Sequence, residues 1–175
     1  MSVKSFKTSG IKVDLAPQGL VLLNTTSFSA VSSQRVNPFS ATYQNYRLII
    51  QVTQSTGSAL KFRLASGASV ISTSTYRRIG MFREAGLTGA FYDSNSETSV
   101  VINDKINGAI SVDLFKPFEA ATTALTYNLA MENGSVLGVV IGAGYNTNLT
   151  SYDGFELSPD SGTITGTLRV YGYNQ

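Results

Sequence analysis

The sequence predicts an all-β protein: a two-sheet antiparallel β-sandwich of jelly-roll-like type, with an extended N-terminal arm. Two observations indicate this fold. Apolar residues recur at every second position in several segments, which is the period of a strand with one buried face. Charged residues make up only 14 % of the chain, and Ser, Thr, Asn and Gly take their place. Those short polar residues suit strands and turns better than helices.

The first 17 residues differ from the rest of the chain. Phe6, Ile11, Val13 and Leu15 are isolated apolar residues among lysines, and a Pro-Gln-Gly break follows. We expect residues 1–17 to form an arm whose four apolar side chains dock on a neighbouring subunit, with a frayed end as the alternative. Residues 18–175 are long enough for one domain with a core of its own.

The first clear strands lie in the middle of the chain. In residues 46–53, Tyr46, Leu48, Ile50 and Val52 share one face, and residues 60–64 alternate between apolar and polar without error. Turn-forming residues at 55–58 separate the two segments. The pattern therefore predicts an antiparallel hairpin here.

Later strands repeat the pattern. Alternation marks residues 110–114, 125–132 and 163–173, and each segment places its larger apolar side chains on one face. Asn133-Gly134 is a tight-turn dipeptide, which makes the segments on either side of it the clearest predicted hairpin. The apolar run 136–144 contains three glycines, and we interpret it as a buried strand.

Helical signals are weak. Residues 81–85 and 117–121 could each form about one turn, which is too short to be stable without tertiary support. Eight or more short strands at regular spacing favour two stacked sheets.

The residue inventory argues against an enzyme, a cofactor and a metal site. The chain has no histidine and no cysteine, which removes the commonest general base and the usual zinc ligands. Asp153 and Glu156 could approach each other as a carboxylate pair, but two solvated charges are the favoured reading. Residues 93–97 resemble the opening of a calcium loop, although a plain polar turn fits them better.

Charge and hydropathy limit the partners. The net charge is +2, and the densest basic patch holds only Arg77, Arg78 and Arg83, so we expect no nucleic-acid binding. No apolar run is long enough for a membrane helix, and residues 1–17 lack a signal-peptide core. The expected protein is soluble, made in the cytoplasm and not inserted in a membrane.

Tyrosines beside small polar residues in probable loops are candidate ligand contacts. A tyrosine offers a sugar both an apolar ring and a hydrogen-bonding hydroxyl; capping the open end of the sandwich is the alternative role. The candidate receptor or glycan contacts are Tyr92, Asn95, Tyr145, Asn146 and Tyr152.

Three stretches resemble virion proteins of tailed bacteriophages, especially the terminal domains of tail fibres and similar appendages. They are residues 19–29, residues 39–50, and residues 154–159 with 162–173. The similarity runs in order from about residue 19 to residue 173, whereas residues 66–122 show only generic β patterning. The matching positions belong to strands and turns, so no functional residue is carried over.

The resemblance implies a trimeric, jelly-roll-like module on the virion exterior, synthesised in the host cytoplasm. The expected function is that of a non-enzymatic structural protein in a tail fibre or appendage used for host attachment. A capsid decoration (cement) protein that stabilises the head is one alternative, and a carbohydrate-binding module is another. The expected partners are copies of the chain, other virion proteins and a host surface glycan.

Overall fold

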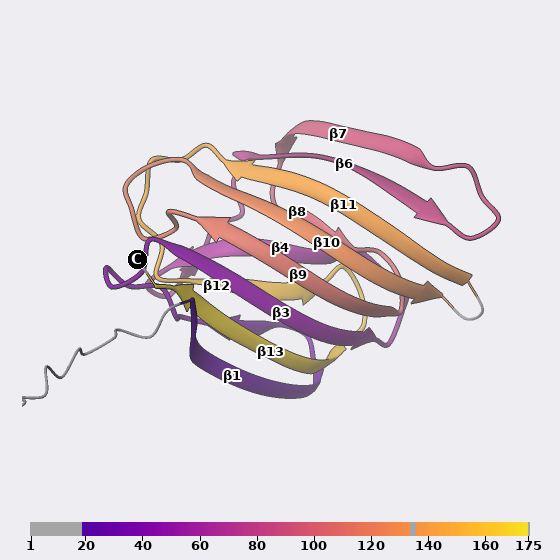
Figure 1. The fold of residues 1–175 in the computed structure, drawn as a ribbon, viewed down its shortest axis with the longest axis horizontal. Helices are drawn as coiled ribbons and strands as arrows, with labels where there is room; N and C mark the ends of the chain where they lie inside the picture. The colour runs from indigo at the N-terminus through magenta and orange to yellow at the C-terminus, as the bar shows by residue number, and fades with distance from the viewer. Residues whose placement is uncertain (1–18, 134–135, 175) are drawn as a thin grey trace, which may run out of the picture.

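A computed structural model describes residues 19–133 and 136–174. These residues form thirteen β-strands in two antiparallel sheets that pack as a sandwich (Figure 1). The predicted fold class, an all-β sandwich of two sheets, is therefore confirmed. The predicted arm, residues 1–17, lies outside the described residues.

The larger sheet has eight strands in the order β1-β13-β3-β9-β10-β11-β6-β7. All of its neighbouring strands run antiparallel. Their bounds are β1 (Leu20–Val31), β13 (Ile164–Tyr173), β3 (Asn45–Gln54), β9 (Asn107–Phe115), β10 (Thr123–Asn133), β11 (Val136–Asn146), β6 (Tyr76–Glu84) and β7 (Ala90–Glu97).

The smaller sheet packs behind the middle of the larger one in Figure 1. Its strands follow the order β2-β12-β4-β5, and β8 also pairs with β4. Their bounds are β2 (Gln34–Val36), β12 (Gly154–Pro159), β4 (Leu60–Ser66), β5 (Ser69–Val70) and β8 (Val100–Asn103). The larger sheet thus has an inner face toward the smaller sheet and an outer face that no described strand covers.

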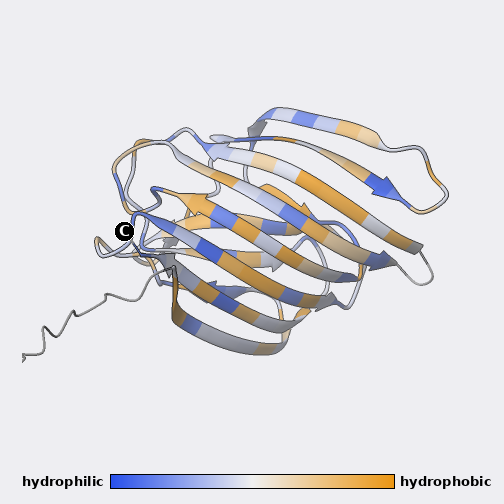
Figure 2. Cartoon of the chain, in the orientation of Figure 1, coloured by the Kyte–Doolittle hydropathy of each residue, from blue (hydrophilic) through white to orange (hydrophobic). Residues whose placement is uncertain are grey.

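The core lies between the two sheets and follows the predicted alternation. Tyr46, Leu48, Ile50 and Val52 of β3 all point inward and are buried. The inward residues of the other predicted strands are buried in the same way: Leu60, Phe62, Leu64, Ile110, Val112, Leu114, Leu125, Tyr127, Leu129, Met131, Ile164, Leu168 and Val170. Figure 2 shows this alternation as successive colours along β3 and β9.

One predicted hairpin is confirmed and the other is wrong. β10 and β11 pair along their whole length, with Asn133 opposite Val136. β3 and β4, in contrast, belong to different sheets. The end of β3 bonds elsewhere, since the Gln54 amide donates to the Ile106 carbonyl at 2.7 Å and the Ser55 amide to that of Thr163 at 2.9 Å. The chain therefore crosses to the smaller sheet instead of turning back.

The weak helical signal at residues 81–85 does not correspond to a helical turn in the structure. Residues 81–84 belong to β6, whose backbone pairs with β11 on one side and with β7 on the other. These ladders use the backbone groups that a helical turn would need. Residues 117–121 form short turns, with the Glu119 amide bonded to the Lys116 carbonyl at 3.2 Å.

Candidate functional site

The outer face of the larger sheet divides into a polar half and an apolar half. The strand registers align side chains in rows that cross the sheet. The central row runs from β13 to β7 through Arg169, Ile49, Ser111, Asn128, Ile141, Met81 and Phe91. Its first four members lie on the polar half, and its last three are large apolar side chains.

We call the outer surface of β11, β6 and β7 the apolar face. Six exposed side chains define it: Leu137, Val139, Ile141, Ile79, Met81 and Phe91. Phe91 is 82 % exposed and Leu137 66 %. In Figure 2 the hydrophobic colour runs along much of β11. The predicted strand at 136–144 is thus present, but the prediction that it is buried is wrong for its outward side.

The inner side of β11 is made of small residues. Gly138, Gly142 and Gly144 point inward together with Val140. A Cβ atom on Gly142 would lie 2.7 Å from Cε1 of Tyr127, and one on Gly144 would lie 2.8 Å from Cγ2 of Val100. Neighbouring side chains already fill the space above these glycines. The strand therefore carries its bulky apolar residues on the side away from the core.

Two tyrosines meet above a pair of glycines on the inner face. Gly142 of β11 lies opposite Gly80 of β6, and the hydroxyls of Tyr127 and Tyr92 hydrogen-bond to each other there. Burial, and then the bond to Tyr92, raises the pKa of the Tyr127 hydroxyl. Tyr127 therefore keeps its proton at physiological pH, and the contact between the two hydroxyls is a packing element.

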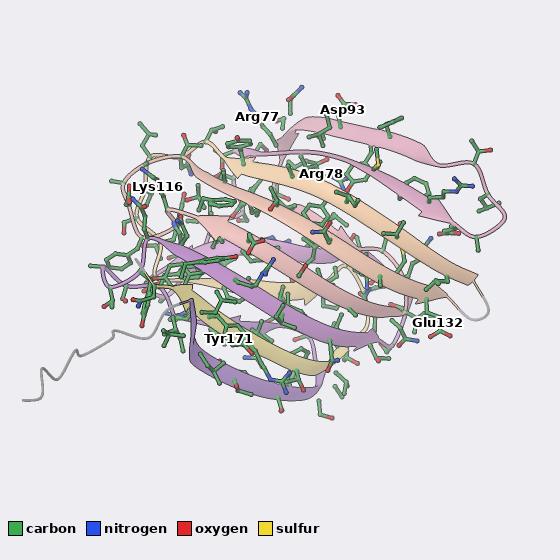
Figure 3. The ribbon with its side chains drawn as sticks, viewed as in Figure 1. Arg77, Arg78, Asp93, Lys116, Glu132 and Tyr171 are labelled. Carbon is green, nitrogen blue, oxygen red and sulfur yellow. The ribbon has the colours of Figure 1, made fainter. Side chains whose placement is uncertain are left out.

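Two of the predicted ligand contacts come together on the outer face. Tyr145 and Asn95 line a groove of about 270 Å³ with Arg77, Asp93 and Ile79. Figure 3 shows Arg77 and Asp93 pointing outward near the β7 edge. The groove joins a half-exposed aromatic ring to an amide, a guanidinium and a carboxylate, which is a set of groups able to hold a small polar ligand.

Tyr92 points to the other side of the sheet. It lines a cleft of about 240 Å³ on the inner side, with Arg78, Phe82 and Asp104 among the lining residues. The Arg78 guanidinium lies 5.3 Å from the Tyr92 ring centroid and 3.8 Å from the Glu97 carboxylate. Tyr92 therefore does not share a site with Tyr145 and Asn95.

The remaining two candidate contacts are buried. Asn146 is 1 % exposed and Tyr152 fully enclosed. The Tyr152 hydroxyl donates to Oδ1 of Asn146 at 2.9 Å, and burial raises the pKa of Tyr152. In this conformation neither side chain can reach a receptor or a glycan.

The acids considered as a carboxylate pair are each engaged by basic groups of the smaller sheet. Glu156 of β12 lies between Arg35 of β2 and Arg63 of β4, and its carboxylate is 3.5 Å from the Arg63 guanidinium. Asp153 accepts a bond from the Gly67 amide at 3.1 Å and lies 3.9 Å from Arg35. Both carboxylates therefore join neighbouring segments of the smaller sheet.

The segment with calcium-loop spacing is strand β7, and its two acids are separated. Asp93 lines the outer groove, whereas Glu97 pairs with Arg78. Within residues 19–133 and 136–174, no three acidic side chains gather closely enough to hold a metal ion.

Two further expectations concern the arm and membranes. The candidate docking residues Phe6, Ile11, Val13 and Leu15 lie outside the described residues. In the part of the chain that the structure describes, no helix is long and apolar enough to cross a membrane.

The apolar face is the feature that sequence reasoning missed, although a signal was present. The register of the β10–β11 hairpin places Val140 opposite Leu129 and Val139 opposite Ala130. Leu129 was predicted to point inward, so Val139 and Ile141 had to point outward. The comparisons with known proteins give no further guide: no protein family and no curated protein matches this chain.

Proposed function

We propose that this chain is a structural protein of the exterior of a bacteriophage particle, a homotrimeric component of a tail fibre or related appendage that acts in host attachment. It works through contacts with other protein surfaces and not through catalysis. The proposal takes its phage context from the resemblance of residues 19–29, 39–50 and 154–159 with 162–173 to tail-fibre modules.

The observation that carries the proposal is the apolar face. Its residues stand outward from a sheet whose inner side is already packed, so they add nothing to the core of this chain. Contiguous apolar patches of this kind mark surfaces that other proteins cover. A chain whose main accessible feature is such a surface is suited to an assembly.

The positions of the charged groups also support a structural role. Arg47 pairs with Asp113 at 2.9 Å across β3 and β9, and Lys105 pairs with Glu84 at 3.0 Å. Glu156 and Asp153 link segments of the smaller sheet. These pairs fix the relative positions of strands and loops, which is what a rigid particle component requires.

Labelling of purified phage particles tests the proposal directly. An antibody against the folded chain should bind intact particles from the strain that carries the gene, and immunogold electron microscopy should place the label on the tail. Absence of the chain from particles by mass spectrometry would contradict the proposal.

The same material separates the alternatives. Label over the head, with particle binding lost when residues 1–17 are deleted, would favour a capsid decoration protein. We expect the isolated chain to show weak or no affinity on a glycan array. Strong saturable binding that is lost in Tyr145→Ala and kept in Tyr171→Ala would favour a carbohydrate-binding module, because Tyr145 lines the groove and Tyr171 lies on the polar half.

A further inference from the structure

We infer that the apolar face is the surface through which copies of this chain associate. The inference rests on the proposed function in one respect only, namely that the chain works as an assembled structural protein. It assigns the contact to the outer side of β11, β6 and β7.

The size of the face fits a protein–protein contact. Its six residues are between 46 % and 82 % exposed, and Phe91 alone is of a residue type that covers about 150–250 Å². The largest apolar patch on a typical monomer covers about 300–600 Å², and each partner in a standard interface contributes about 800 Å². A face of six such residues is comparable with the largest apolar patches of monomers, which are often functional, and it can supply a large part of one side of an interface.

The face has both an anchor and a recess. Phe91 is the most exposed large apolar residue in the described chain, at 82 %. Beside it lies a groove of about 190 Å³ lined by Met81, Gly89, Val139 and Ile141 among others. Cavities of about 150 Å³ hold a benzene ring, so the groove of one copy has room for the Phe91 ring of another. Aromatic anchors in such recesses dominate many interfaces.

The charges next to the face favour a second copy as its occupant. Arg77 and Arg83 lie across from Tyr145 and Val139, and Asp93 and Glu132 lie across from Ile79 and Leu137. All four side chains are exposed, with two charges of each sign. Like faces can therefore meet without net repulsion.

The N-terminal arm fits this face less well. Residues 1–17 carry Lys4, Lys7 and Lys12 against the single acid Asp14. An arm of a neighbour lying here would add net positive charge to a face whose four bordering charges already balance. The arm also joins the domain at β1, the edge strand farthest from β7 in the larger sheet. A second copy of the apolar face is the occupant that the charges favour.

Sedimentation of the full chain tests the inference. At micromolar concentration the wild type should have a mass of two or three times the 18.7 kDa of one chain. The double variant Ile141→Thr, Phe91→Thr should sediment as a monomer with an unchanged circular dichroism spectrum, because threonine keeps the strand propensity while removing apolar area. The matched control Ile49→Thr, in the same row on the polar half, should remain associated.

If the double variant fails to fold, cross-linking of single-cysteine variants gives a second test of the same contact. The chain has no cysteine, so Met81→Cys places one thiol at the centre of the face. Oxidation should cross-link Met81→Cys chains at least about tenfold faster than Ser111→Cys chains. Four outcomes would each overturn the inference. The wild type could be monomeric, or the two cysteine variants could cross-link at equal rates. The double variant could associate as the wild type does, or association could be lost on deleting residues 1–17 alone. Particle labelling can fail independently of all these results, so the proposed function and this inference are separable.

Discussion

The polar and apolar halves of the outer face of the larger sheet differ in how their outward side chains are paired. On the polar half, outward groups bind each other: Arg47 pairs with Asp113 at 2.9 Å, and the Tyr173 hydroxyl donates to the same carboxylate at 2.5 Å. On the apolar half, Ile79 lies in the same row and Ile141 in the next row, and both side chains are more than half exposed. The backbone ladder is continuous across both halves. The halves therefore differ in their outward side chains: those of the polar half bind each other within one chain, whereas those of the apolar half leave apolar surface exposed.

The inner sides of the two halves differ as well. Under the polar half, Leu48, Ile50 and Val112 fill the space between the sheets directly. Under the apolar half, β11 presents glycines, and Tyr127 and Met131 of the adjacent strand lie over them. The comparison indicates that the space on the inner side of β11 is already filled by side chains of the adjacent strand. The apolar side chains of β11 face outward as a consequence of packing.

The largest expected effect is the pH dependence of the free energy of unfolding, which the buried tyrosines under the apolar half should cause. Burial raises the pKa of Tyr127 under the apolar half, and that of Tyr76, above the usual value of 10. Unfolded tyrosines lose their protons first as pH rises. The free energy of unfolding should therefore be intact below about pH 10 and fall above it by about 1.4 kcal/mol per pH unit for each such tyrosine.

Urea unfolding at several pH values, followed with tyrosinate absorbance, measures this loss. Tyr173 lies at the surface of the polar half, and its pKa is raised by partial burial and by Asp113. It should ionise above the usual tyrosine range but before the buried Tyr76 and Tyr127, and Tyr173→Phe should remove that intermediate step. Gradual ionisation of every tyrosine in the folded state would contradict the difference between the halves.

A substitution under the apolar half should have the next largest effect. Gly142→Ala places a methyl group against the Tyr127 ring and should destabilise the fold by about 1–3 kcal/mol, the usual range for an overpacked core. Ala143→Ser adds one atom at the next, outward position and should change stability by under about 0.5 kcal/mol. Chemical denaturation measures both. Equal effects would show that the inner side of β11 is less tightly packed than described.

The smallest effect concerns the ion pair of the polar half. Arg47 and Asp113 are partly exposed, at 36 % and 21 % of their side chains. A double-mutant cycle with Arg47→Ala and Asp113→Asn should give a coupling below about 1 kcal/mol, decreasing with salt. A coupling well above that value, or one insensitive to salt, would mean that the polar half contributes more to the fold than its exposure indicates.

The sequence predicted the strands better than their connections. Period-two alternation identified the inward side chains of β3, β4, β9, β10 and β13 because burial acts on each strand separately. Alternation carries no information on whether consecutive strands pair or cross between sheets, so the β3–β4 hairpin was wrong. Residues 81–85 resembled a helical turn because Met, Glu and Ala favour helices, whereas two neighbouring ladders impose the strand.

The candidate site was less predictable. Polar neighbours in sequence suggested that Tyr152 and Asn146 were exposed, but such neighbours do not report the direction of a side chain, and both are buried. Tyr145 and Asn95 were chosen separately, and only the pairing of β11 with β6 and of β6 with β7 brings them to one groove. The run at 137–141 is apolar at nearly every position, so its composition alone hid which side faces outward.

The two ends of the described chain lie side by side, since the Asn174 amide donates to the Gly19 carbonyl at 2.9 Å. A short linker could therefore join these residues, and new ends could be opened in the exposed segment 85–89 between β6 and β7. Circular permutation succeeds at such surface sites. Tags or fusion partners added at residues 19 and 174 would emerge from one corner of the domain, beside β1 and far from β7 in strand order.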